Sequence, residues 1–369
     1  MSSFTDGASD RAATAAAPTT EPTIAVPGRR GVRLGPVAGV FHRRYALGLG
    51  VVVVALVPVL VASVSIGTFA ISLDHLFAVF IGQGQPAETL IVDRRLVRVV
   101  GGMLVGAALG AAGGVTQSLT RNPLASPDIL GVTAGAGVLA VMVIITPIAG
   151  VAAAVAVPAA AMIGGLVVTA IVLAFAWRRG LDPLRLVLVG IGITAICQAI
   201  TQWILMTAEL EWAAVAMRWL TGSLEGVTWT DAAMVAVVVI VAGLVLAVLT
   251  PQLAAIRLGE DVARSLGVRA GHVQLASLVA AVALVAVATA AAGPVGFVAF
   301  VAPQIALRVF GTAGPPVFAA GLTGALLVSD ADFTTRFLPV SLPVGIITSF
   351  LGGIVLITLL SRYVRRSRA

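Results

Sequence analysis

The sequence contains no lysine, and all 23 of its basic residues are arginine. A P-loop needs a lysine on the nucleotide phosphates, so this chain does not hydrolyse ATP by a P-loop. Schiff-base catalysis is excluded because it needs a lysine amine. The single cysteine, Cys197, excludes an internal disulfide. His42, His75 and His272 are scattered and lack the spacing of metal ligands.

Charge is also scarce: 11% of the 369 residues are charged and 59% are hydrophobic. An ordinary soluble domain has about 25% charged and about 45–50% apolar residues. This composition excludes a soluble globular enzyme, a disordered chain and a coiled coil. Long unbroken apolar runs exclude the alternating pattern of a β-barrel. At about 20 residues per span there is room for about ten helices, so we predict an all-α polytopic membrane protein.

The apolar runs divide the chain into a tail, a membrane domain and a second tail. Residues 1–45, rich in Ala, Thr, Pro and Gly, predict a disordered tail and not a typical cleavable signal peptide. Residues 46–362 form the predicted membrane domain, with its longest inner loop at 251–271, and 363–369 form a short basic tail. The ten spans are expected at roughly 46–70, 96–119, 128–146, 150–176, 186–206, 231–250, 272–292, 295–310, 315–329 and 341–361.

Arginine is unequally divided between the two sides of this arrangement. Eighteen arginines lie on the side of the N-terminus and five on the other, which predicts a multi-pass protein with both termini in the cytoplasm. The net charge of +7 then reflects the membrane topology and does not indicate nucleic-acid binding. No charge lies near the middle of a predicted span. This argues against an ion-coupled carrier and against an intramembrane enzyme, both of which use ionisable groups there.

Glycine recurs at four-residue spacing in the second predicted span. The positions are Gly102, Gly106, Gly110 and Gly114. They share one face of the helix and allow another backbone to approach closely, which indicates helix packing; a direct role in substrate contact is the lesser alternative.

The fifth predicted span carries one polar stripe on an otherwise apolar helix. Its members are Thr194, Gln198, Thr201 and Gln202, at positions i, i+4, i+7 and i+8. Uncharged donors and acceptors suit a translocation path for a large polar solute. The alternative, hydrogen bonding between helices, is given equal weight. Gln117 on the second span and Gln304 on the eighth are expected to face the same path.

The inner loop contains a short segment with the signals of a capped helix. Glu260 and Asp261 lie in its first turn, where the helix dipole favours anions, and Gly267 supplies the stop. Val262 and Leu266 form a small apolar face. We favour docking of this segment into a partner's groove over contact with lipid. The candidate coupling residues are Leu258, Gly259, Glu260, Asp261, Val262, Ala263, Arg264, Leu266 and Gly267.

Arg95, Arg98 and Arg336 lie on the outer side, against the positive-inside trend. They are candidates for pairing with carboxylates of an external protein. Contact of their side chains with lipid headgroups is the equal alternative.

Several ordered segments together resemble the FecCD-type permeases of ABC importers for ferric siderophores, haem and vitamin B12. The similarity extends over nearly everything after residue 46. It is carried by Arg95-Leu96-Val97-Arg98, LVGAALGAAGGVTQSLTRNPLASPDILGVTAGAG (104–137), LGEDVARSLGV (258–268), GPVGFVAFVAPQIALRVFG (293–311), residues 331–336 and LPVGIITSFLGG (342–353). Four positions depart from the family pattern: Gln304 replaces the usual His, Leu307 a common Arg, Ser341 an acidic residue and Gly353-Ile354 a frequent Ala-Pro.

The resemblance implies a type II permease fold and a role in alternating access in the bacterial cytoplasmic membrane. The implied partners are two ATP-binding subunits, a second permease in a homo- or heterodimer, and an extracytoplasmic substrate-binding protein. ATP and Mg would be bound by the ATP-binding subunits, and this chain would carry no cofactor or metal and catalyse no covalent step. Leu258 to Gly267 would be the coupling helix, and Arg95, Arg98 and Arg336 would meet the binding protein. Ferric-siderophore complexes are the expected substrate; haem, cobalamin, or a secondary carrier mechanism are the alternatives.

Overall fold

A computed structural model describes residues 29–34, 37–67, 69–147, 151–177, 183–312, 314–338 and 342–367. Two strands, β1 (Arg29–Leu34) and β2 (Val37–His42), precede the helices. The helices are α1 (Arg43–Ser65), α2 (Leu73–Phe80), α3 (Pro86–Thr120), the 3-10 turn η1 (Pro127–Leu130), α4 (Val132–Ile145), α5 (Ala153–Ala176), α6 (Pro183–Thr207), α7 (Leu210–Leu220), α8 (Trp229–Arg257), α9 (Glu260–Ser265), α10 (Ala270–Ala292), α11 (Val298–Phe310), α12 (Val317–Thr335) and α13 (Val344–Ser367).

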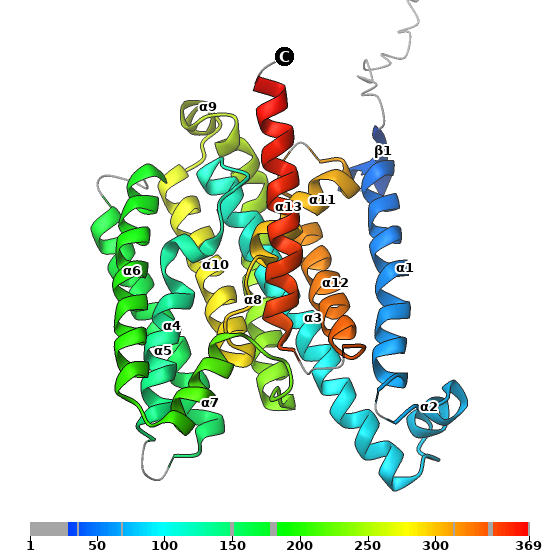
Figure 1. Ribbon diagram of the computed structural model, residues 1–369. Helices are drawn as coiled ribbons and strands as arrows, with labels where there is room; N and C mark the ends of the chain where they lie inside the picture. The colour runs from blue at the N-terminus through cyan, green and yellow to red at the C-terminus, as the bar shows by residue number, and fades with distance from the viewer. Residues whose placement is uncertain are drawn as a thin grey trace, which may run out of the picture.

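Ten of these helices coincide with the ten predicted spans. Seven of them, α1, α3, α5, α6, α8, α10 and α12, are long and apolar enough to cross a membrane among the described residues. The other three are shorter apolar helices: α4, α11 and the Val344–Thr358 part of α13. Figure 1 places the start of α1, the short helix α9 and the end of α13 at one end of the bundle, and α2 and α7 at the other. We refer to these as the α9 end and the α7 end.

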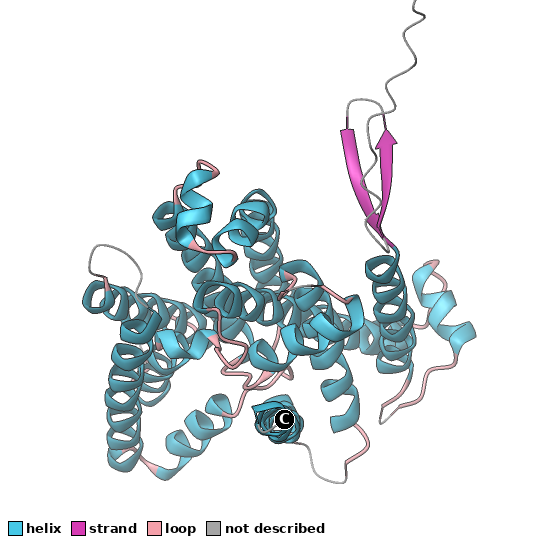
Figure 2. Cartoon of the chain, turned by 90° about the horizontal axis from the view of Figure 1, so that it is seen from above, coloured by secondary structure: helices cyan, strands magenta, loops and turns pink. Residues whose placement is uncertain are grey.

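The structure adds elements that the sequence did not predict. Within the predicted disordered tail of residues 1–45, β1 and β2 pair antiparallel (Figure 2), while residues 1–28 lie outside the described part of the chain. The stretches 71–95 and 207–230, which lie between predicted spans, contain the helices α2 and α7. α3 also begins at Pro86 instead of residue 96, because proline at the first helical position is compatible with a helix start. Its 35 residues are about 52 Å long at 1.5 Å per residue, well beyond the hydrocarbon thickness.

The centre of the bundle is formed by α3, α10 and α12, whose surfaces are mostly buried, whereas α1, α6 and α8 lie at the periphery. α3 and α12 approach each other through small residues. A Cβ on Gly106 would collide with the carbonyl of Gly324, and one on Gly110 with the carbonyl of Ala320. The glycine face therefore sets the distance between α3 and α12. This supports the packing interpretation for Gly106 and Gly110.

The other two glycines of this face, Gly114 and Gly102, have different neighbours. Gly114 lies against Val317 and Ala320 of α12, while a Cβ on Gly102 would meet the side chain of Leu224. Three of the four glycines, Gly106, Gly110 and Gly114, therefore pack against α12. Gly102, nearer the α7 end, packs against the loop before α8.

Candidate functional site

The four side chains of the polar stripe on α6 line one cavity. Its volume is about 750 Å³, and Thr194, Gln198, Thr201 and Gln202 all contribute to its wall. Other parts of its wall come from α4 and from α7 and the residue that follows it, including Thr133, Met217 and Thr221. Within the described lining, Asp128 is the one ionisable side chain. The cavity is therefore bordered mainly by uncharged polar and apolar groups, as the spacing on the helix predicts.

The threonines and the glutamines of the stripe differ in how accessible their polar groups are to a solute in the cavity. Thr201 is buried and its hydroxyl donates to the carbonyl of Cys197 at 2.9 Å. The Thr194 hydroxyl is buried without a hydrogen-bond partner. Gln198 and Gln202 are exposed on the single chain. The amides are thus the groups best placed to contact a solute.

Gln117 and Gln304 do not face this cavity, contrary to the sequence expectation. Both are buried, and Nε2 of Gln304 donates to Oε1 of Gln117 at 2.7 Å. Nε2 of Gln117 in turn donates to the carbonyl of Phe300 at 3.0 Å. The two amides pair across the α3–α11 contact because a buried amide is costly unless its hydrogen bonds are made. Their structural role is to join α3 to α11.

α9 is a short helix held between two glycines. Gly259 (φ +130°) precedes it and Gly267 (φ +79°) follows it, both in conformations that disfavour other residues. The amides of Gly267 and Val268 donate to the carbonyls of Arg264 and Ala263, each at 2.9 Å, which is a Schellman ending. The helix start and stop predicted from the sequence are confirmed.

The two faces of α9 have different environments. Ala263 is fully buried in a cluster with Leu253, Ile256, Ala270 and Val273. On the other face Leu258 is 73% exposed and Leu266 is 66% exposed, with Val262 also exposed. An exposed apolar face of this kind at the end of a bundle is available to a partner groove.

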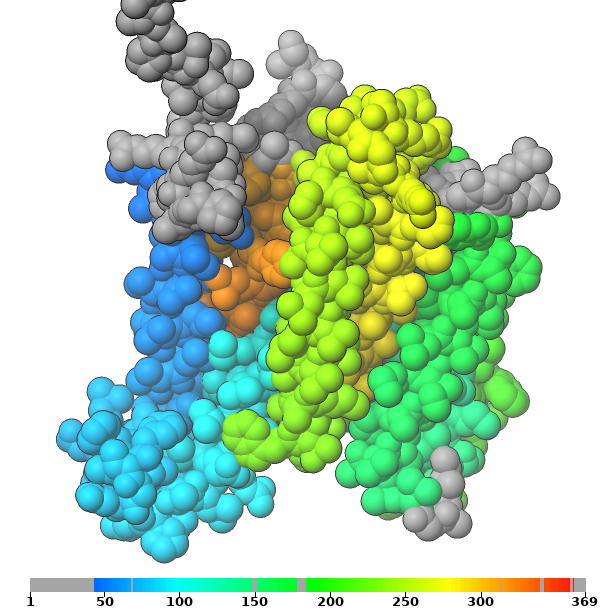
Figure 3. Space-filling view, turned by 180° about the vertical axis from the view of Figure 1, so that it is seen from behind, coloured from blue at the N-terminus to red at the C-terminus, as the bar shows by residue number. Residues whose placement is uncertain are grey.

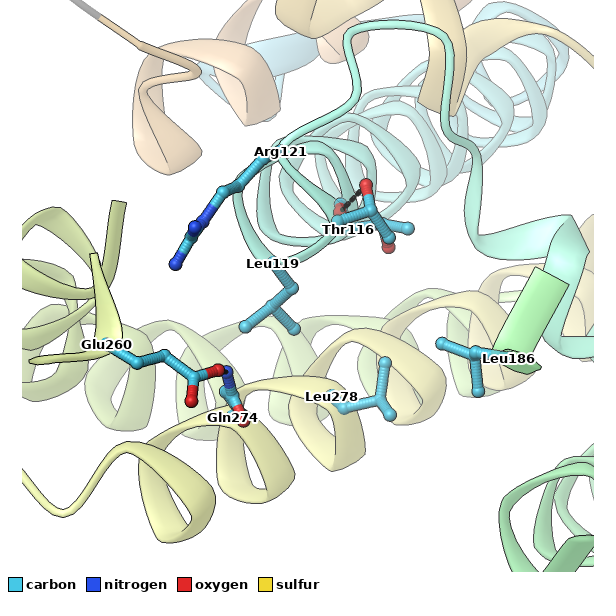
Figure 4. Close-up of a pocket in the computed structure, with 8 residues that line it drawn as sticks. Thr116, Leu119, Arg121, Leu186, Glu260, Gln274 and Leu278 are labelled. Carbon is cyan, nitrogen blue, oxygen red and sulfur yellow. Dashed lines mark hydrogen bonds between the residues drawn. The ribbon is translucent and has the colours of Figure 1, made fainter. Parts of the chain in front are cut away.

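Polar contacts attach both α9 and the end of α8 that precedes it to the bundle. Nε2 of the buried Gln274 on α10 donates to Oε1 of Glu260 at 3.1 Å. Arg121, the residue that ends α3 with φ +51°, donates from Nη2 to the carbonyl of Ile256 at 2.7 Å. Figure 4 shows that Arg121, Glu260 and Gln274 line a cavity together with Leu119 and neighbouring side chains. This cavity of about 260 Å³ lies behind α9. Sequence reasoning missed both Gln274 and Arg121, because neither is part of the capped segment.

At the α7 end, the structure brings Arg98 and Arg336 together on a buried carboxylate. Nε of Arg98 lies 2.8 Å from Oδ1 of Asp332, and Nη2 of Arg336 lies 2.9 Å from Oδ2. Glu225, in the loop after α7, lies 4.0 Å from Arg98 and 2.7 Å from Arg218. The sequence placed Asp332 only at a helix end and gave no sign of this pairing.

Arg95 and Arg336 also hold the end of α1. Nη1 of Arg95 donates to the carbonyls of Val64 and Ser65, at 2.8 and 3.1 Å. Arg336 donates to the carbonyl of Ser63. These carbonyls have no partner within the helix because they lie in its last turn. Arg95 and Arg336 are thus engaged inside the chain, while Arg98 keeps 25% of its side chain exposed.

Comparisons with known proteins agree with this architecture. The model of the FecCD transport family matches residues 54–362. The chain belongs to the FecCD transport family. It is 39% identical over 309 residues to the ferric enterobactin transport system permease protein FepG of Escherichia coli, covering 81% of this chain and 91% of FepG. It is 37% identical to the achromobactin transport system permease protein CbrC of Dickeya dadantii, covering 80% of this chain and 85% of CbrC.

A solved structure shows the fold. An inward-facing conformation of a proposed metal-chelate type ABC transporter matches with a TM-score of 0.74 and 24% identity, covering 86% of this chain and 99% of that one. The FecCD chain described here therefore has the all-helical type II fold of ABC importer permeases. As a member of the family it is a transport protein of the permease type.

Proposed function

We propose that this chain is the permease subunit of an ATP-driven importer that carries ferric-siderophore complexes into the cell. The observation that carries the proposal is the cavity of about 750 Å³ lined by the stripe on α6. Its volume lies in the range of sites for sizeable organic ligands. The similar proteins FepG and CbrC are named for ferric enterobactin and achromobactin transport, which supports a siderophore complex as the solute.

A second permease would complete the translocation path. Gln198 and Gln202 are exposed on the single chain although they line the cavity. A partner helix that covers the two exposed amides, in a homo- or heterodimer, would enclose them between two chains.

The α9 segment is the proposed contact with an ATP-binding subunit. Leu258, Val262 and Leu266 offer an exposed apolar face, and Asp261 is almost fully exposed beside it. ATP and Mg would be bound by that subunit, and its closure would push α9 against α8 and α10. The α9 end, with both tails, would then lie in the cytoplasm, and the protein would be a multi-pass component of the bacterial inner membrane.

The α7 end would receive the substrate-binding protein. Arg98, partly exposed beside Glu225, is the candidate for pairing with its carboxylates. Arg95 and Arg336 would act mainly by holding α1 and Asp332 in position under that surface, since their guanidinium groups are engaged.

The test combines copurification with uptake. A tagged chain is isolated from native membranes in mild detergent, its partners are identified by mass spectrometry, and the complex is placed in proteoliposomes with its binding protein. We expect an ATP-binding subunit and ATP-dependent uptake of a radiolabelled ferric siderophore. Uptake of haem or cobalamin in place of the siderophore would overturn the substrate assignment. Uptake driven by an ion gradient, with no ATP-binding subunit, would overturn the importer mechanism.

A further inference from the structure

The eight-residue helix α2 has three distinct faces. Leu76 is buried and Val79 partly buried, in a cluster with Val64 of α1 and Val92 of α3. A second face is apolar but exposed: Leu73 is 63%, Phe77 67% and Phe80 61% exposed. These positions follow i, i+4 and i+7, and Ile81 at i+8 continues the same stripe. A helix in water that packs against one protein neighbour needs the buried face but not the exposed apolar face.

The third face of α2 is polar. Asp74 is exposed, and Nδ1 of His75, whose side chain is 55% exposed, lies 2.7 Å from Oε1 of Glu88 on α3. Successive residues of a helix are separated by about 100°. Asp74 therefore lies to one side of the exposed apolar stripe, while Leu76 and Val79 lie to the other. The order around the helix is apolar exposed, polar, and buried against the bundle.

The position of α2 explains why it has an exposed apolar face. Figure 2, seen along the bundle, places α2 outside the outline of the spanning helices and beside α1. Figure 3 shows it projecting sideways past α1 and α3 at the α7 end. The neighbouring α1 exposes its own apolar stripe, including Val54 at 71% and Val57 at 53%. In a spanning helix this stripe contacts lipid, so a helix lateral to it lies over the bilayer.

We propose that α2 is an interfacial membrane anchor whose Leu73, Phe77, Phe80 and Ile81 face enters phospholipid at the α7 end. Aromatic and aliphatic residues on one face with polar groups on another are typical of helices that lie in the headgroup and acyl boundary. The His75–Glu88 contact and the Leu76 cluster fix the rotation of α2 about its axis, so that the phenylalanines are directed away from the bundle. The anchor is distinct from the permease function and requires only that the chain is embedded in a bilayer.

Spin labels on two faces of the same helix test the proposal. The single native cysteine is replaced (Cys197→Ala), and labels are attached in separate Phe77→Cys and Asp74→Cys variants of the complete complex. The protein is placed in nanodiscs of phosphatidylethanolamine and phosphatidylglycerol, and collision rates with oxygen and with a water-soluble nickel chelate are measured. A Val54→Cys label on α1 supplies the lipid reference.

We expect the label at residue 77 to resemble that at residue 54, with several-fold more oxygen collision and less nickel collision than at residue 74. Nickel access at residue 77 equal to that at residue 74 would place the face in water and overturn the proposal. Low collision with both reagents would mean that protein covers the face, which also overturns it. A Phe80→Cys label repeats the measurement one turn further along, in case the variant at residue 77 does not assemble.

Discussion

Oε1 of Glu260 accepts a hydrogen bond from Nε2 of Gln274, so the first residue of α9 is attached to α10 at 3.1 Å. Oε2 of the same carboxylate is paired with Arg264 inside α9. Glu260 therefore connects the rigid helix α9 to a mostly buried spanning helix. A separate contact, from Arg121 to the carbonyl of Ile256, attaches the end of α8 just before α9 to the end of α3.

Removing the hydrogen bond between Glu260 and Gln274 should uncouple ATP hydrolysis from transport. In the Gln274→Leu variant we expect the ATP-binding subunit to copurify as before, because the exposed face of α9 is unchanged. Uptake per ATP hydrolysed should fall several-fold, since movement of α9 would no longer draw α10 with it. The measurement is simultaneous uptake and ATP hydrolysis in proteoliposomes.

Two further variants separate coupling from stability. Gln252→Leu, a glutamine near the end of α8 that does not make this contact, is the matched control and should keep the wild-type ratio. Exchanging the pair, Glu260→Gln with Gln274→Glu, keeps a donor opposite an acceptor and should restore part of the ratio. An unchanged ratio in Gln274→Leu, in a complex that is otherwise active, would rule out the link while leaving the importer function intact.

The polar stripe on α6 yields a second prediction. Replacing both exposed amides, Gln198→Leu with Gln202→Leu, should lower the maximal uptake rate at least several-fold, because the path would lose its hydrogen-bonding groups. Thermal stability and copurification should change little, since neither amide is buried. Ile191→Ala, on the same helix and outside the cavity lining, is the control. Wild-type uptake by the double variant would show that the solute does not contact these amides.

Patterns within one helix could be predicted from the sequence, because they depend only on helical geometry. The stripe from Thr194 to Gln202 needs a period of 3.6 residues, and the start and stop of α9 need only local signals. Both are found in the structure. The ten apolar runs also coincide with ten helices, since each run is long compared with the loops.

Contacts between distant segments could not be predicted in this way. Gln117 meets Gln304 only because α11 packs beside α3, and no local pattern shows that a polar side chain faces a neighbour instead of a cavity. Arg98 and Asp332 are likewise separated by more than 200 residues. For Arg95 and Arg336 the sequence showed positive charge on the outer side, but not that α1 ends within their reach.

The buried carboxylate between two arginines provides a third prediction. Asp332→Asn would leave Arg98 and Arg336 near each other without their shared counter-charge, and losing one partner of a buried pair typically costs about 3–5 kcal/mol. We expect a clear fall in the melting temperature in detergent. Asp330→Asn, at an exposed position on the same helix, should melt like the wild type. Equal melting of both variants would mean that Asp332 does not hold the two arginines.

The pair between α3 and α11 leads to a fourth prediction. Gln304→Leu removes the donor to Gln117 and leaves a buried amide oxygen unpaired, a loss of about 1–3 kcal/mol. Gln304→His, the residue that related permeases usually carry there, keeps a ring N–H near the same oxygen and should be tolerated. Melting temperature distinguishes the two variants. Uptake per folded complex should be unchanged in both, because this pair does not line the cavity on α6. A loss of uptake without a loss of stability would show that Gln117 contributes to the translocation path.

The contact between Gly106 and Gly324 predicts that replacing Gly106 with alanine lowers the stability, whereas the same replacement at an open helix position does not. Alanine normally stabilises a helix relative to glycine by about 0.5–1 kcal/mol, because glycine loses more backbone freedom on folding. At Gly192 on α6 a Cβ would meet nothing within 4 Å, so Gly192→Ala should raise the melting temperature slightly or leave it unchanged. At Gly106 the same methyl group would collide with the carbonyl of Gly324. Gly106→Ala must therefore separate α3 from α12, and we expect a net loss of about 1–3 kcal/mol. A melting temperature for Gly106→Ala at or above that of Gly192→Ala would mean that the two backbones are not in close contact.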